Sequence, residues 1–240
     1  MTAFIIDTET DQGTNPRPVQ VATIDLTTGQ QWMAYFNSGR PISPVTTQIH
    51  GITDDDVAGL DAFDLSNFNV PEYLIGHNVN FDWRVIGRPE AKLICTVRLA
   101  RLAFPEWYSY KQSRCIEQLF NLQNRGDDIT RFTQQAHDAL GDVKMCYEIY
   151  KACCEKLGIH YHNYAAAHLL CQKASKTQGQ SSTRNTSDQP MSVMPFGKYR
   201  GQPIAQLPKP YVKWILANIP ALRPNLINAL QQRLGSVQPG

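Results

Sequence analysis

Three features are missing from this sequence of 240 residues, and each absence narrows its possible functions. No apolar run is long enough to span a bilayer, so no membrane partner is expected. The first residues lack a basic stretch followed by an apolar one and carry an acid at Asp7, which is unlike a signal peptide. The six cysteines show no C-x-x-C spacing, which favours reduced thiols over a zinc cluster. We therefore expect a cytoplasmic protein.

Acidic residues are nearly absent from the last part of the chain. Residues 171–240 hold nine Lys and Arg but one acid, Asp188, for a net charge of +8. Residues 1–170 hold 14 Lys and Arg and 20 Asp and Glu, for a net charge of −6. An acidic body collects cations and a basic tail favours a polyanion such as nucleic acid. Charge alone leaves open the alternative that the tail presents a solvated basic face.

What is present predicts an α/β domain. Apolar runs rich in β-branched and aromatic residues predict strands, the first three as a meander, at 3–8, 19–26, 30–37, 73–76 and 92–95. Helical spacing predicts helices at 80–87, 96–103, about 113–120, 139–157 and 163–174. Strands that come first and then alternate with helices indicate an α/β sheet of mixed direction.

The chain is expected to divide into three parts. The α/β domain covers residues 1–174. Residues 175–192 are polar throughout most of their length and predict a flexible linker, because they cannot bury apolar surface. Residues 193–240 predict a small basic C-terminal module that ends in an amphipathic segment.

The first candidate site lies at the end of the apolar run 3–6, where Asp7 and Glu9 follow. Side chains alternate along a strand, so these two carboxylates point the same way. Neighbouring carboxylates in a largely buried place repel each other, and hard divalent cations prefer such oxygen ligands. The pair predicts a metal site, although on its own it also fits a solvated strand end.

Two later segments add acids and a histidine. Asp82 closes the segment 77–82, directly after a predicted buried strand, and His137 and Asp142 lie at the start of the long helix. Five residues turn a helix by about 500°, so His137 is expected on the loop and Asp142 inside the first turns. Acids that hold two divalent ions, with a histidine as base, suit phosphodiester hydrolysis. Taken singly, each residue also fits a capping or surface role.

Together these segments resemble the three motifs of the DEDDh exonuclease family, D-x-E, H-N-x-x-F-D and H-x-A-x-x-D, in order over residues 1–170. The resemblance implies a ribonuclease H-like mixed sheet with flanking helices. It implies a metal-dependent 3′–5′ exodeoxyribonuclease that hydrolyses DNA from its 3′ ends, single-stranded or duplex, to nucleoside monophosphates. A role in DNA repair or recombination follows from the same resemblance.

The resemblance also assigns residue roles. The four acids Asp7, Glu9, Asp82 and Asp142 would hold two Mg²⁺ ions, for which Mn²⁺ could substitute, and His137 would be the general base. Substrate contacts near the 3′-terminal nucleotide are implied for Thr8, Thr10 and His50. One departure is the segment 11–13, Asp-Gln-Gly, where many relatives have Thr-Gly, so the backbone turn near the terminal sugar is expected to differ.

The C-terminal module contains a further candidate surface. Lys198 and Arg200 flank Tyr199, and paired charge and aromatic ring suit phosphate contact and base stacking, although a tight-turn role fits as well. This module resembles the C-terminal region of bacterial family members, and a protein partner could also bind there. Two other functions stay open: an exoribonuclease that trims RNA ends, and a DNA-binding or replisome-associated module with secondary nuclease activity.

Overall fold

The computed structural model describes residues 1–133, 138–182, 192–194, 199, 201–218 and 224–235. The chain forms two compact units, Met1–Gly179 and Gln180–Gly240. Within the described residues, every helix is too short or too polar to cross a bilayer. The predicted boundaries at residues 174 and 192 stay predictions.

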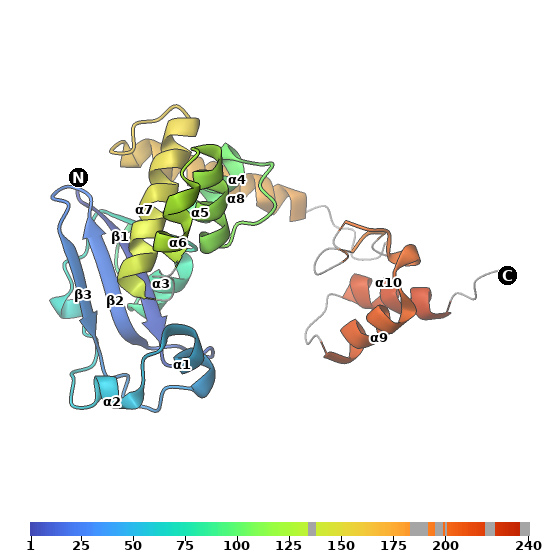
Figure 1. Ribbon diagram of the computed structural model, residues 1–240, viewed down its shortest axis with the longest axis horizontal. Coiled ribbons are helices and arrows are strands. Elements are labelled where there is room, and N and C mark those ends of the chain that lie inside the picture. Colours follow the sequence, from blue (N-terminus) through green and yellow to red (C-terminus); the bar gives the residue numbers. More distant parts are fainter. Residues whose placement is uncertain (134–137, 183–191, 195–198, 200, 219–223, 236–240) are drawn as a thin grey trace. The chain divides into compact units, whose positions relative to one another are not determined.

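A mixed five-stranded sheet forms the centre of the first unit (Figure 1). In chain order its strands are β1 Ala3–Thr10, β2 Pro18–Asp25, β3 Gln31–Tyr35, β4 Tyr73–Gly76 and β5 Lys92–Cys95. They lie in the order β3-β2-β1-β4-β5. The meander β1-β2-β3 is antiparallel, whereas β4 runs parallel to both β1 and β5. This arrangement confirms the predicted mixed α/β sheet.

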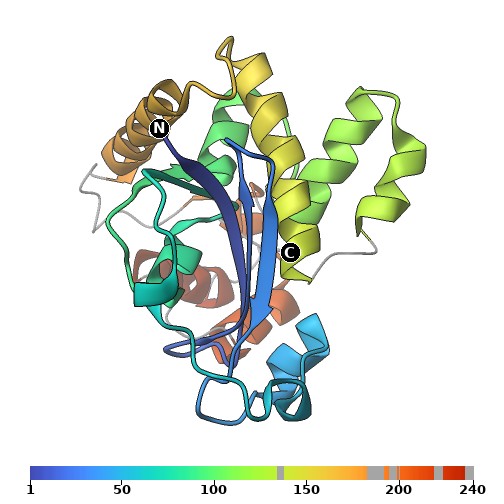
Figure 2. The same cartoon turned by 90° about the vertical axis from the view of Figure 1, so that its left-hand side faces the viewer.

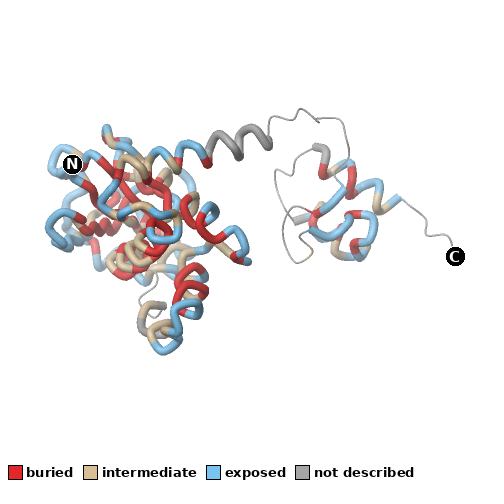
Figure 3. The backbone as a smooth tube through the Cα atoms, turned by 90° about the horizontal axis from the view of Figure 1, so that it is seen from above, coloured by how far each residue is buried: buried red, intermediate tan, exposed pale blue. Residues whose placement is uncertain are grey.

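Helices flank the sheet, and helix α7 covers its central strands. The described helices of this unit are α1 Pro44–His50, α2 Asp54–Val57, α3 Asn80–Val85, α4 Thr96–Ala103, α5 Gln112–Leu122, α6 Gly126–Thr133, α7 Ala139–Lys156 and α8 Tyr164–Ser182. Helix α7 packs on β1 and β2, while α4 and α5 pack on α7 and α6 on α5 (Figure 2). Buried residues concentrate in these packed strands and helices (Figure 3).

Two helices differ from the sequence prediction. Helix α6 was not expected. Ile129 and Phe132, one turn apart, pack against the core of the unit, and two acids in the first turn favour the helix dipole. Helix α8 continues to Ser182, past residue 174 where the helix was expected to end. Lys, Gln and Ala have good helix propensity even when exposed, so a polar composition excludes burial but not a helix.

The six cysteines are all buried and free of disulfides. Burial raises the pKa of the thiols of Cys115 and Cys171 to about 12, because the thiolate would lose its hydration. These side chains therefore behave as small apolar groups within the core.

The second unit has a core of its own. Its described elements are a 3-10 turn at Ile204–Gln206, α9 Lys209–Asn218 and α10 Pro224–Gly235, with a β-bridge between Val193 and Pro203. A buried apolar cluster joins them and consists of Met194, Ile204, Leu207, Val212, Ile215, Leu226, Ala229 and Leu230. Helix α9 contributes Val212 and Ile215, one turn apart on one face.

Candidate active site and metal centre

The candidate site lies where the carboxyl ends of β1 and β4 meet. These strands are parallel neighbours, so the chain leaves both at the same edge of the sheet. The turn after β4 leads into α3, which carries Asp82. Gly76 permits this tight passage, because a Cβ at that position would lie 3.2 Å from the carbonyl oxygen of Ile6 and 3.1 Å from Cβ of Val79.

Three carboxylates from two distant segments converge at this edge. Asp7 and Glu9 lie on β1 and point to the same face, as alternation predicts. Helix α7 packs on β1 and brings Asp142 from its first turn. One carboxylate oxygen from each residue lies within 4.8 Å of the others. All three residues are half-buried, so the cluster retains access to solvent.

Asp82 is the fourth acid and lies deeper, with an exposed fraction of 4%. The hydroxyl of Thr8 donates a hydrogen bond of 2.8 Å to Oδ1 of Asp82. Thr8 points away from the face that carries Asp7 and Glu9, so it anchors α3 to β1 rather than adding to the carboxylate cluster.

The electrostatics of these acids favour protonation in the absence of a cation. Loss of hydration, followed by the negative charges of Asp82 and Asp142, raises the pKa of Asp7 well above its usual value. Burial and the same two neighbours raise the pKa of Glu9 to about 8. Burial also raises the pKa of Asp82, and the hydrogen bond from Thr8 opposes that shift.

The donor set fits divalent metal ions. In the described part of the chain, Asp7, Glu9 and Asp82 form no ion pair with Lys, Arg or His. Clustered carboxylates without a cationic partner repel one another, and a hard cation with a preference for oxygen ligands relieves that repulsion. Asp7, Glu9 and Asp142 are therefore a candidate metal site, and Asp82 is placed to support it.

Two glutamines, which the sequence patterns did not reveal, position Asp142. The side-chain amide of Gln112, in the first turn of α5, donates to the carbonyl oxygen of Asp142 at 2.6 Å and to its Oδ1 at 3.1 Å. Gln20 of β2 receives a hydrogen bond from the amide of Ala139 and donates to the N-cap carboxylate of Asp138. These contacts fix the start of α7 against the sheet.

Two histidines brace the same edge. His50 Nε2 donates to the carbonyl oxygen of Thr10 at 3.1 Å, and its Nδ1 accepts from the amide of Ile52. His77 Nε2 donates to the carbonyl oxygen of Tyr110 at 2.8 Å, and its Nδ1 lies 2.9 Å from the Thr96 hydroxyl. Burial lowers the pKa of His77 to about 4, so its ring is neutral near pH 7.

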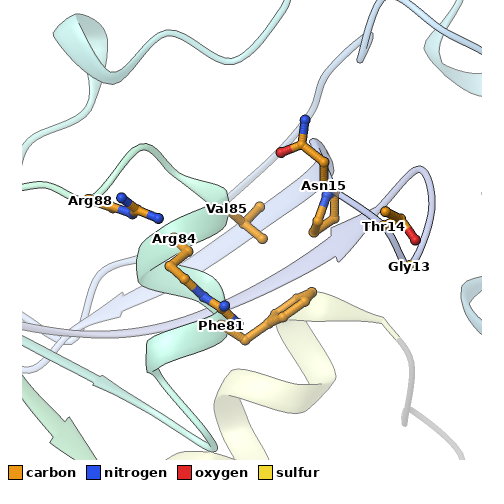
Figure 4. Close-up of a pocket in the computed structure, with 8 residues that line it drawn as sticks. Gly13, Thr14, Asn15, Phe81, Arg84, Val85 and Arg88 are labelled. Atoms are coloured by element: carbon orange, nitrogen blue, oxygen red, sulfur yellow. The ribbon is translucent and has the colours of Figure 1, made fainter. Parts of the chain in front are cut away.

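A cavity of about 410 Å³ lies beside α3 (Figure 4). One wall is the loop at 13–16, and the other carries Phe81, Arg84 and Arg88. Phe81 and Asp82 are consecutive residues of α3, so one helix both lines the cavity and carries an acid. Both arginines are exposed and, over the described residues, neither forms an ion pair with an acid. Two of the residues that line the cavity are therefore positively charged.

The structure describes most of the predicted site residues. It brings Asp7, Glu9 and Asp142 together, and it places Thr8 on Asp82 and His50 on Thr10. Three predicted residues lie outside the described residues: His137, Lys198 and Arg200. The arginines beside the cavity and the two glutamines carry no local sequence signal, because their importance depends on which distant segments they meet.

Comparison with known proteins gives matches in both units of the chain. An exonuclease family model matches residues 4–150, and a second, short model, whose description refers to a quorum-sensing-regulated virulence factor, matches residues 189–219. Exodeoxyribonuclease 10 of Escherichia coli K12 is 26% identical over 247 aligned positions, which cover 96% of this chain and 97% of that protein.

Two further matches cover a smaller part of the chain. The structure of exonuclease X in complex with 5′ overhanging duplex DNA superposes with a TM-score of 0.53 at 25% identity, over 69% of this chain and 99% of that one. The PolC-type DNA polymerase III of Listeria innocua is 24% identical over 60% of this chain, but over 11% of its own length.

Proposed function

Because the chain belongs to the exonuclease family and is a 3′–5′ exonuclease, we propose that it degrades DNA from 3′ ends and releases nucleoside monophosphates. The observation that carries the proposal is the convergence of Asp7, Glu9 and Asp142 at the end of β1. The DNA-directed relatives support DNA as the substrate. DNA repair or recombination as the pathway, and the cytoplasm as the location, stay predictions.

The four acids are the residues that would hold the metal. Asp7, Glu9 and Asp142 offer oxygens within 4.8 Å of one another, and Asp82 adds negative charge from α3. Two Mg²⁺ ions, or Mn²⁺ in their place, would stabilise charge on the scissile phosphate and lower the pKa of the attacking water. His137 is proposed as the base that takes a proton from that water.

The chain's other residues hold these acids in place and receive the strand. Thr8 fixes Asp82, and Gln112 fixes Asp142, so both carboxylates keep their positions before substrate arrives. We propose that the two arginines beside the cavity, on the helix that carries Asp82, bind backbone phosphates of a strand whose 3′ end lies at the acids. Thr10 and His50, joined by their hydrogen bond, are proposed to border the terminal nucleotide.

A gel assay tests the proposal with a single-stranded oligonucleotide that is labelled at either end. With Mg²⁺, the 5′-labelled strand is expected to shorten through a ladder, while the 3′ label is released at once as a mononucleotide. EDTA and the variant Asp7→Ala are expected to abolish both results. A Lys156→Ala variant is the control, because α7 places it about 20 Å from Asp142 along the helix.

Equal activity of the wild-type protein and Asp7→Ala, or activity that survives EDTA, would overturn the proposal. RNA of the same sequence, mixed with the DNA in one reaction, tests the RNA-trimming alternative. Faster loss of the RNA would replace DNA as the substrate while leaving the chemistry of the site unchanged.

A further inference from the structure

A row of aromatic rings lies on the surface of the second unit. The ring centroids of Tyr199 and Tyr211 are 4.6 Å apart, and those of Tyr211 and Trp214 are 6.5 Å apart with planes that differ by 15°. Tyr211 and Trp214 are one helical turn apart on α9 and therefore share a face. We call these three residues the aromatic ladder.

The ladder lies beside the buried core of the second unit, and its residues are not among the fully buried ones. The buried residues of α9 are Val212 and Ile215, which lie one position further along the helix than the two ladder residues. Tyr199 and Tyr211 pack partly against that core, whereas Trp214 is 55% exposed. The ladder therefore joins one exposed ring to two half-buried ones and offers more aromatic surface than a single exposed ring, which is typical of a binding surface.

The charge of this unit identifies the class of partner. Residues 180–240 contain seven Lys and Arg and one acid, Asp188. Lys213 is exposed on the same helix, about 100° around the axis from Trp214. Positive charge attracts a phosphate backbone, and aromatic rings stack on bases whose faces are accessible, as they are in single strands. A protein partner with an apolar patch would gain nothing from this excess of positive charge.

We propose that the aromatic ladder binds single-stranded DNA by stacking on its bases, while Lys213, on the adjoining face of α9, contacts a phosphate. This inference rests on the proposed function only for its consequence, which is that the strand stays attached while its 3′ end is degraded. A second binding module on the same chain raises the local concentration of the substrate for the first. Long strands would benefit from this attachment more than trinucleotides.

The test measures DNA binding by the full chain in EDTA, so no turnover is needed. Fluorescence anisotropy follows a dye-labelled (dT)30 and an abasic oligomer of the same length and charge. Trp214→Ala is expected to weaken binding of (dT)30 about tenfold, which is within the range found for loss of one stacked base. Its affinity for the abasic oligomer is expected to be unchanged, because that oligomer has phosphates but no bases.

Two further variants separate stacking from folding and charge. Trp214→Phe retains an aromatic ring and is expected to keep most of the affinity, and Val193→Ala removes other exposed apolar surface of the same unit and serves as the control. Lys213→Ala is expected to weaken both oligomers and to lower the salt dependence by about one phosphate contact.

The inference is overturned if Trp214→Ala binds (dT)30 as tightly as the wild-type protein, or if it loses equal affinity for the abasic oligomer. It is also overturned if Trp214→Phe is as weak as Trp214→Ala, since stacking would then not be the cause. A chain that binds (dT)30 through the ladder but hydrolyses nothing would contradict the proposed function and leave this inference standing.

Discussion

The hydroxyl of Thr8 donates a 2.8 Å hydrogen bond to Oδ1 of Asp82, which joins the first acidic motif to the second. Asp82 is buried, so its carboxylate cannot rely on water to fix its orientation. The bond therefore connects the position of an acid on α3 to the strand that carries Asp7 and Glu9. This contact and three other features of the structure lead to measurable predictions.

The first prediction concerns Thr8. Thr8→Val keeps the side-chain shape but removes the donor, and a hydrogen bond to a charged group contributes about 1.5–3 kcal/mol. We expect turnover of a short oligonucleotide to fall about 10- to 100-fold. Thr8→Ser retains the hydroxyl and should stay close to the wild-type rate. Equal rates for the valine and serine variants would show that the bond does not position Asp82.

The second prediction concerns metal removal. In EDTA, Asp7→Asn is expected to raise the free energy of unfolding, because it removes one of several repelling carboxylates. The same variant should lose the increase in melting temperature that Mg²⁺ gives the wild-type protein. Calorimetry with and without Mg²⁺ checks both results. Asp127→Asn, which changes an exposed acid of α6, is the control and should show neither effect.

The third prediction concerns pH and His77. Its folded-state pKa of about 4 lies below the ordinary value of 6.5, so between these values the unfolded chain binds a proton that the folded chain does not. Stability from this group is complete above pH 6.5 and is lost as pH falls towards 4. After allowance for its partial exposure we expect a loss of about 1–2 kcal/mol.

The variant His77→Gln makes this prediction specific. Its amide does not titrate in this range, so denaturant unfolding of the variant should depend less on pH between 6.5 and 4 than unfolding of the wild-type protein. Parallel curves for the two proteins would mean that His77 does not account for the acid sensitivity.

The fourth prediction concerns the cavity beside α3. Arg84→Ala should raise KM for single-stranded DNA several-fold and reduce its salt dependence, with little change in kcat, because a phosphate contact is lost at a distance from the reacting bond. Lys156→Ala also removes one positive charge, but from the last turn of α7, at the opposite end of that helix from Asp142. This variant should leave KM unchanged. A fall in kcat alone would place Arg84 at the chemistry instead.

Hydrophobic periodicity and the order of the motifs were sufficient to predict the mixed sheet of the first unit and most of its helices. The alternation of side chains along β1 predicted that Asp7 and Glu9 share a face of the sheet. The apolar run at 73–76 predicted the strand that precedes Asp82. Helix α6 was missed, because it is eight residues long and its apolar pattern consists of only two side chains, Ile129 and Phe132. The end of α8 was placed too early, because the polar composition after residue 174 was taken to exclude a helix.

The residues that support the acids could not be predicted from sequence. Gln112 contacts Asp142 across 30 positions of the chain, and Gln20 contacts Asp138 across 118. A glutamine gives no local signal that distinguishes a buried clamp from a surface side chain. Only the packing of α5 and α7 on the sheet creates those contacts.

The burial of all six thiols has a practical consequence. Alkylating reagents attack thiolates, and with thiol pKa values near 12 at Cys115 and Cys171 almost none is present at neutral pH. A cysteine introduced at an exposed position, such as Leu169 in the first unit or Val193 in the second, would react far faster than any native thiol. Fluorescent dyes could then be attached to each unit without first removing the native cysteines, and energy transfer between them would report the distance between the units as DNA is consumed.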